Sequence, residues 1–179
     1  MDFVPFYTKF KDLAAKETRS ITITAKDLGV PPGEYGLIEY YCTDDTCDCR
    51  KVMLQIVESI PPHKTLATIG YGWESVEFYT KWMHGDKKLG QQITGAYLEV
   101  FGTQSQYAQK FLELVPALAF SNEYIERLKR HYKMFKNYTP NNLNTPEIPH
   151  KPKIPHTSKK LKKTATRLAD INNWHGHWN

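Results

Sequence analysis

All three cysteines of this 179-residue chain lie within eight residues, at Cys42, Cys47 and Cys49. The C-x4-C-x-C spacing falls between two segments, 37–42 and 51–58, whose residue patterns are typical of β-strands. A tight connection between two strands can direct several side chains to one point. Thiolates are ligands of zinc and of iron–sulfur clusters, so the cluster predicts a metal site held between two strands.

A structural zinc site needs a fourth ligand. His131 is the predicted one, because it lies beside the apolar stripe of a predicted helix and is expected to face inward. A core histidine bonded to the backbone is the competing interpretation for this residue. His63 and His84 are expected in loops within reach of the cysteines. If water fills the fourth position instead, the metal becomes a Lewis acid.

The cysteines also have interpretations without a metal. They can simply pack, or they can carry out redox chemistry, with Arg50 beside Cys49 lowering a thiol pKa. The aspartates of the same stretch, Asp44, Asp45 and Asp48, are most simply turn formers. The spacing therefore favours a metal site and leaves the thiol chemistry open.

Strand and helix patterns follow one another along the chain. Short connections between successive strands favour antiparallel pairing over parallel crossovers. The fold class predicted from these patterns is α+β, a small antiparallel β-meander with helices packed on one side. Strands are predicted at residues 20–24, 37–42, 51–58 and 65–71, and helices at 6–17, 74–84 and 86–93.

The C-terminal half of the body is predicted to be helical. Ser105 is the predicted N-cap of one helix, which Pro116 is expected to kink or end. Ser121 is the predicted N-cap of a second helix, which continues to about Lys136. Residues 96–101 fit either a strand or a loop.

The net charge of the chain lies outside this body. Residues 139–179 carry seven of the 24 basic and two of the 19 acidic residues, so residues 1–138 hold 17 of each. We therefore expect a neutral α+β domain over 1–138 and a disordered, Pro- and Lys-rich tail over 139–179 that can form a short amphipathic helix. Possible partners of the tail are nucleic acid or an acidic protein. The basic residues expected to contact such a partner are Lys159, Lys160, Lys162, Lys163 and Arg167.

Several functional classes receive no support from the sequence. No apolar run of about 18 residues predicts a transmembrane helix, and the N-terminal residues lack the pattern of a secretory signal. An odd number of cysteines, two of them in C-x-C, favours a reducing compartment, so we expect a cytoplasmic protein. Phosphate-binding and hydrolase motifs are also lacking.

One set of residues connects part of the chain with known proteins. These residues are Tyr41 and Cys42, Cys47, Cys49 and Arg50, 66–69, Gln104 and Ser105, Arg127 and Leu128, His131 and Tyr132, and Phe135 and Lys136. Through them, about residues 35–136 resemble a group of small bacterial proteins of unassigned function. The resemblance implies a bacterial cytoplasmic protein, but no substrate, ligand set or catalytic residue.

The hypothesis that best fits these features is a non-enzymatic binding or regulatory module. In it, zinc bound by Cys42, Cys47, Cys49 and His131 staples the domain, and the basic tail contacts an acidic partner. The alternative is an enzyme that uses the cysteine cluster as a catalytic zinc or a redox thiol site. A third interpretation is an interaction protein without a metal.

Overall fold

A computed structural model describes residues 2–25 and 28–139, and the predicted tail lies outside them from residue 140 onward. The described residues form an antiparallel sheet with helices, which confirms the predicted α+β class. The strands are β1 (Phe3–Pro5), β2 (Arg19–Ile23), β3 (Gly33–Cys42), β4 (Lys51–Glu58), β5 (Thr65–Gly72) and β6 (Gly95–Leu98). The helices are η1 (Phe6–Thr8), α1 (Lys11–Glu17), α2 (Val76–Trp82), α3 (Lys87–Gln92), α4 (Ala108–Ala119) and α5 (Asn122–Lys136).

The sheet is built on a meander of four consecutive strands. Strands β3, β4, β5 and β6 are neighbours in sequence order, and every pairing is antiparallel. The register pairs Glu39 with Leu54 and Leu54 with Ile69. Strands β1 and β2 share the free edge of β3, where β1 pairs with its C-terminal end and β2 with its N-terminal half. The C-terminal end of β3 therefore lies beside both β1 and the start of β4.

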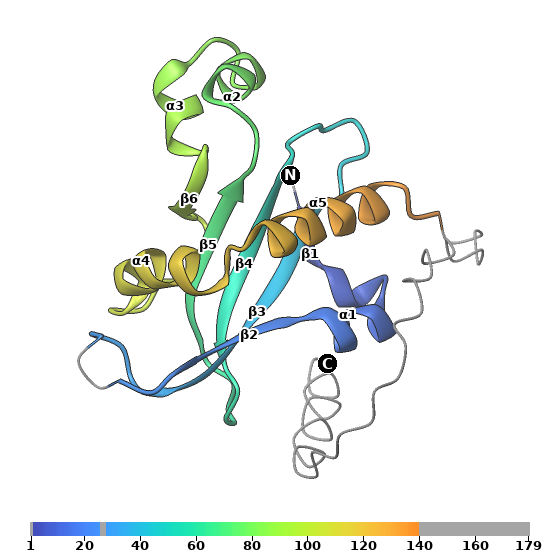
Figure 1. The fold of residues 1–179 in the computed structure, drawn as a ribbon. Helices are drawn as coiled ribbons and strands as arrows, with labels where there is room; N and C mark the ends of the chain where they lie inside the picture. Colours follow the sequence, from blue (N-terminus) through green and yellow to red (C-terminus); the bar gives the residue numbers. More distant parts are fainter. Residues whose placement is uncertain (1, 26–27, 140–179) are drawn as a thin grey trace, which may run out of the picture. The chain divides into compact units, whose positions relative to one another are not determined.

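The main core lies between one face of this sheet and the last two helices. Figure 1 shows α4 and α5 crossing the same face of the sheet, as predicted. Successive strand residues point to opposite faces, so Leu37, Glu39 and Tyr41 share one face while Cys42 belongs to the other. The Tyr41 hydroxyl hydrogen-bonds to the main chain of Leu128 in α5, which identifies the helix-covered face. The core residues contributed by α4 and α5 are Phe111, Val115, Tyr124, Leu128 and Phe135.

The short helices α2 and α3 lie beyond the end of β5 (Figure 1). Each begins at a side-chain cap, with Ser75 accepting from the Phe78 amide and Asp86 from the Leu89 amide. Gly72, at the end of β5, permits close packing there, since a Cβ atom on it would lie 2.2 Å from the Ile93 carbonyl oxygen. This packing brings Tyr79 of α2 next to the start of β4.

Several boundaries differ from the sequence predictions. Helix α4 continues through Pro116 to Ala119, so the proline does not end the helix, which was one of its two expected effects. The proline lies in the last turn of α4, where it removes one backbone bond without ending the helix. Ser121 caps α5 as predicted, whereas Ser105 accepts from the Tyr107 amide in the turn before α4. Within the described part of the chain, no helix is long and apolar enough to span a bilayer.

Candidate metal centre

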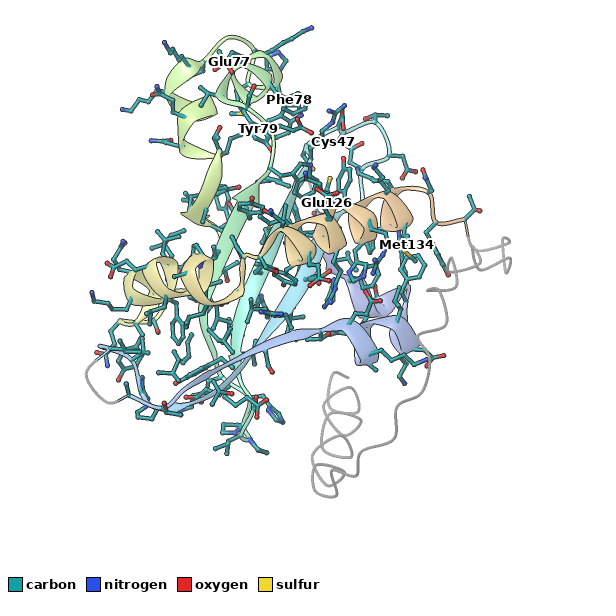
Figure 2. All side chains as sticks on the ribbon, in the orientation of Figure 1. Cys47, Glu77, Phe78, Tyr79, Glu126 and Met134 are labelled. Carbon is teal, nitrogen blue, oxygen red and sulfur yellow. The ribbon has the colours of Figure 1, made fainter. Side chains whose placement is uncertain are left out.

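The three cysteines meet at the end of the β3–β4 hairpin. Cys42 is the last residue of β3, Cys47 and Cys49 lie in the loop that follows, and β4 begins at Lys51. Their Sγ atoms all lie within 4.8 Å of one another. Cys42 and Cys49 are fully buried, whereas Cys47 is partly exposed. Figure 2 shows Cys47 in this loop.

A compact turn brings Cys47 back towards Cys42. The Asp44 carboxylate accepts hydrogen bonds from the Thr46 amide (2.9 Å) and hydroxyl (2.7 Å), and the Cys47 amide donates to the Asp44 carbonyl (3.1 Å). These bonds hold the pKa of the exposed Asp44 carboxyl below its usual value. At the start of the loop, Thr43 donates its amide to the Asp2 carbonyl. Asp44 is therefore a turn former, as expected for aspartate in this position.

Arg50 fixes the other end of the loop through an unusual backbone conformation. Its φ angle of 41° lies in the left-handed region, which residues other than glycine rarely adopt. The Tyr132 hydroxyl of α5 accepts from the Arg50 amide (3.4 Å), and the Tyr79 hydroxyl of α2 donates to the Arg50 carbonyl (2.6 Å). Two helices thus hold the peptide groups next to Cys49. Sequence patterns identified these tyrosines only as aromatic residues of helices.

Charged side chains around the loop bind one another or the backbone. The Asp48 carboxylate is paired with the Arg50 guanidinium (2.9 Å) and accepts from the Tyr132 hydroxyl (3.4 Å). Arg50 also contacts Glu74, which precedes α2. At the end of α5, the Lys136 ammonium donates to the Asp44 carbonyl. These contacts connect the cysteine loop to α5 and to the start of α2.

The environment of Cys47 and Cys49 favours neutral thiols when no metal is bound. Burial, followed by the neighbouring thiols Cys47 and Cys42, raises the pKa of Cys49 to about 12. Burial, then Cys42, also raises the pKa of Cys47. The Lys51 amide bonds to the Cys49 sulfur and acts in the opposite direction, as does the charge of Lys136. A thiol with a raised pKa is a weak nucleophile at neutral pH, because the thiolate is the reactive form.

The three sulfurs can hold a metal ion. In a tetrahedral zinc–thiolate site, zinc–sulfur bonds of about 2.3 Å place the sulfurs about 3.8 Å apart. The observed separations are no greater than 4.8 Å, so contraction of about 1 Å brings the thiols to that geometry. Across residues 2–25 and 28–139, no histidine, aspartate or glutamate joins this group.

The structure does not bring the predicted fourth ligand to the cysteines. Both ring nitrogens of His131 bond to carboxylates, Nδ1 to Glu39 Oε2 (2.7 Å) and Nε2 to Glu17 Oε2 (2.9 Å). His63 lies in the turn after β4, at the opposite end of that strand from the cysteine loop. The expectation that His131 faces inward is correct, since its side chain is 1% exposed. The competing interpretation expected a histidine hydrogen-bonded to the backbone, but the ring nitrogens of His131 bond to the side chains of two glutamates.

His131 is the centre of a buried ionic network that joins three elements. Glu39 belongs to β3, Glu17 ends α1, and His131 lies in the middle of α5. Each ring nitrogen of His131 therefore has a carboxyl oxygen as its partner, and the guanidinium of Arg130 also lies 3.5 Å from Nε2. The Tyr41 hydroxyl also donates to Glu39 Oε2 (2.9 Å). The Phe6 ring stacks on the imidazole of His131, with 4.2 Å between the ring centroids.

The two carboxylates of this network differ in environment. Glu17 also pairs with Arg127 and Arg130 at the surface. Glu39 is 5% exposed, and within the described residues its Oε1 atom has no hydrogen-bond partner. The other carboxyl oxygen of Glu39, Oε2, is bonded to His131 and to the Tyr41 hydroxyl. We therefore assign the network a role in holding α1, β3 and α5 together.

Comparison with known proteins supplies no family for this chain. No protein-family description, no curated protein and no solved structure matches it. The resemblance to small bacterial proteins therefore stays a prediction. Any functional argument depends on the geometry of the cysteine cluster.

Proposed function

We propose that this protein is a non-enzymatic binding or regulatory module whose domain is stapled by zinc at Cys42, Cys47 and Cys49. The observation that carries the proposal is the convergence of three Sγ atoms within 4.8 Å at the end of the β3–β4 hairpin. Thiols that only fill an apolar core are not drawn into contact with one another, because each packs as a small hydrophobic side chain against any apolar neighbour. A zinc ion explains the convergence, since it binds thiolates and compensates their charge.

Zinc would connect the parts of the fold that meet at this loop. Cys42 ends β3, and Cys49 lies directly before Arg50, whose peptide groups bond to tyrosines of α2 and α5. A metal that bridges these cysteines fixes the hairpin end against both helices. Because a preformed site is rarely present in an unfolded chain, the free energy of zinc binding adds to folding stability.

The fourth coordination position of the zinc distinguishes a structural zinc site from a catalytic one. Three protein ligands and an open position are also the arrangement of catalytic zinc sites, where water occupies the fourth place. An enzyme with a catalytic zinc is therefore the second candidate. A redox thiol site is the third, and the raised pKa values of Cys47 and Cys49 speak against it.

The basic tail is the remaining part of the proposal. Residues Lys159, Lys160, Lys162, Lys163 and Arg167 would contact nucleic acid or an acidic protein, and all five lie outside the described residues. The support is the charge distribution, because the body is neutral and the net charge of +5 resides in the tail.

The first test is the metal content of the full chain, purified without an affinity tag. We expect about one zinc per chain and a loss of thermal stability on chelation. At free zinc a thousand-fold above Kd, binding contributes about 4 kcal/mol, which corresponds to a decrease in Tm of roughly 10 °C on chelation. The control is the variant His175→Ala/His177→Ala, because these histidines near the C-terminus can bind metal adventitiously. If the purified variant contains no zinc, the metal of the wild-type protein is bound by the tail, and the proposal is contradicted.

The second test separates the metal site from a redox thiol site. In metal-free protein, we expect the rate of Cys47 alkylation by iodoacetamide to rise about tenfold per pH unit from pH 7 to pH 9, because its raised pKa keeps the thiolate fraction small. Mass spectrometry of the labelled peptide measures the rate. Urea-unfolded protein is the control, since its thiols have the ordinary pKa of about 8.5 and react faster at pH 7. A rate that is already independent of pH near neutrality would support the redox alternative.

A further inference from the structure

The three cysteines differ in their access to solvent. Cys42 and Cys49 are fully buried, whereas Cys47 is partly exposed. A small oxidant such as hydrogen peroxide therefore reaches Cys47 before the other two. Susceptibility to oxidation follows exposure and thiolate character, and zinc coordination supplies the thiolate form.

Cys47 also has partners for a second chemical step. Its sulfur lies within 4.8 Å of the sulfurs of both Cys42 and Cys49. An oxidised Cys47 thus lies next to a second thiol that can attack it. Sensor cysteines typically combine an accessible thiol with a resolving cysteine of this kind.

The backbone decides which neighbour resolves the oxidised sulfur. Cys47 and Cys49 are separated by one residue, and this C-x-C spacing is too tight for ordinary disulfide geometry. Cys42 is five residues from Cys47, with the Asp44 turn between them. Cys47 belongs to no strand or helix, so a loop shift that brings its sulfur to about 2.05 Å from that of Cys42 breaks no sheet pairing.

We propose that Cys47 is an oxidation site for hydroperoxides and that Cys42 resolves it into a Cys42–Cys47 disulfide, which expels the metal. In the first step the Cys47 thiolate attacks the peroxide oxygen, the O–O bond breaks, and sulfenic acid and hydroxide form. In the second step the Cys42 thiolate attacks the sulfenic sulfur, the S–O bond breaks and hydroxide leaves. The two sulfurs lose two electrons in total, and the peroxide accepts them.

The metal leaves because its ligand set is lost. After the disulfide forms, only Cys49 is left as a thiolate ligand, and it takes up a proton once the ion has gone. This regulatory step depends on the proposed function, because it requires bound zinc. The disulfide chemistry requires the arrangement of the three sulfurs and one ionised thiol, and zinc-free protein also holds a small fraction of thiolate, so the two can fail separately.

The test treats the full chain with stoichiometric hydrogen peroxide, in zinc-loaded and in metal-free form. Remaining thiols are then alkylated under denaturing conditions, and the peptides are mapped by mass spectrometry. We expect a Cys42–Cys47 disulfide, an alkylated Cys49 and one zinc released per disulfide, with recovery after dithiothreitol. A Cys47–Cys49 disulfide, or first oxidation at Cys42 or Cys49, would overturn the assignment.

Two serine variants make the assignment sharper. In Cys42→Ser, we expect the disulfide yield to fall at least tenfold, and dimedone should trap sulfenic acid on Cys47. In Cys49→Ser, the Cys42–Cys47 disulfide should still form, whether or not the variant holds zinc. If wild-type protein contains no zinc but forms this disulfide, the oxidation site stands and the zinc proposal fails. If zinc is present but peroxide takes Cys47 to sulfinic acid without a disulfide, the zinc proposal stands and the Cys42–Cys47 disulfide is refuted.

Discussion

Replacing Cys49 by serine is expected to reduce the zinc affinity of the protein by more than about 100-fold. Loss of a partner that only orients a ligand already costs 10–100-fold in affinity, and Cys49→Ser removes a ligand itself. Cys49 is fully buried and its sulfur lies within 4.8 Å of that of Cys47, so neighbouring water cannot replace its sulfur without rearrangement of the loop. Competition with a chromophoric zinc chelator measures the affinity directly.

The matched control for this variant is Asp48→Asn in the same loop. The Asp48 carboxylate pairs with Arg50 and contacts the Tyr132 hydroxyl, outside the sulfur group. This variant should keep one zinc per chain with less than about a tenfold change in affinity, because its effect on the ligands is indirect. Melting both variants in excess chelator separates loss of metal from damage to the fold. Retention of zinc in Cys49→Ser together with loss in Asp48→Asn would refute the thiolate site.

Replacing His131 by alanine is expected to lower the free energy of unfolding by about 3–5 kcal/mol. The change leaves the carboxyl group of Glu39 buried and without its His131 partner, and breaking a buried pair from one side costs this much. Urea unfolding followed by tryptophan fluorescence measures the loss. The same variant should keep its zinc affinity, because the His131 ring nitrogens bond to Glu39 and Glu17.

Two further variants define the cause of that loss. Arg130→Ala removes an exposed partner of Glu17 and should cost less than about 1 kcal/mol. The double variant Glu39→Leu/His131→Leu removes both buried charges and should be more stable than His131→Ala, since apolar replacement of a whole pair avoids the unpaired charge. If His131→Ala is as mild as Arg130→Ala, the network contributes little. A large loss of zinc affinity in His131→Ala would instead restore this histidine as the fourth ligand.

Most strands and helices could be predicted from local patterns. The alternation of Val52, Leu54 and Ile56 marks β4, and the apolar stripe after Ser121 marks α5, because burial on one side imposes a regular spacing on the sequence. Strand β1 left no such pattern, since three residues are too few to show alternation. Its place beside β3 depends on pairing with Cys42 and its neighbours, which a local pattern does not encode.

The candidate site likewise has a part that the sequence predicted and a part that depends on tertiary contacts. The sequence alone determined that three thiols lie at one hairpin end, because all three cysteines fall within eight residues at the junction of two strand patterns. Only the tertiary structure decided that Tyr79 and Tyr132 hold the loop and that His131 belongs to two carboxylates. These partners lie 29 to 114 residues apart. Such pairings depend on how the helices pack on the sheet, and many distant residues determine that packing together.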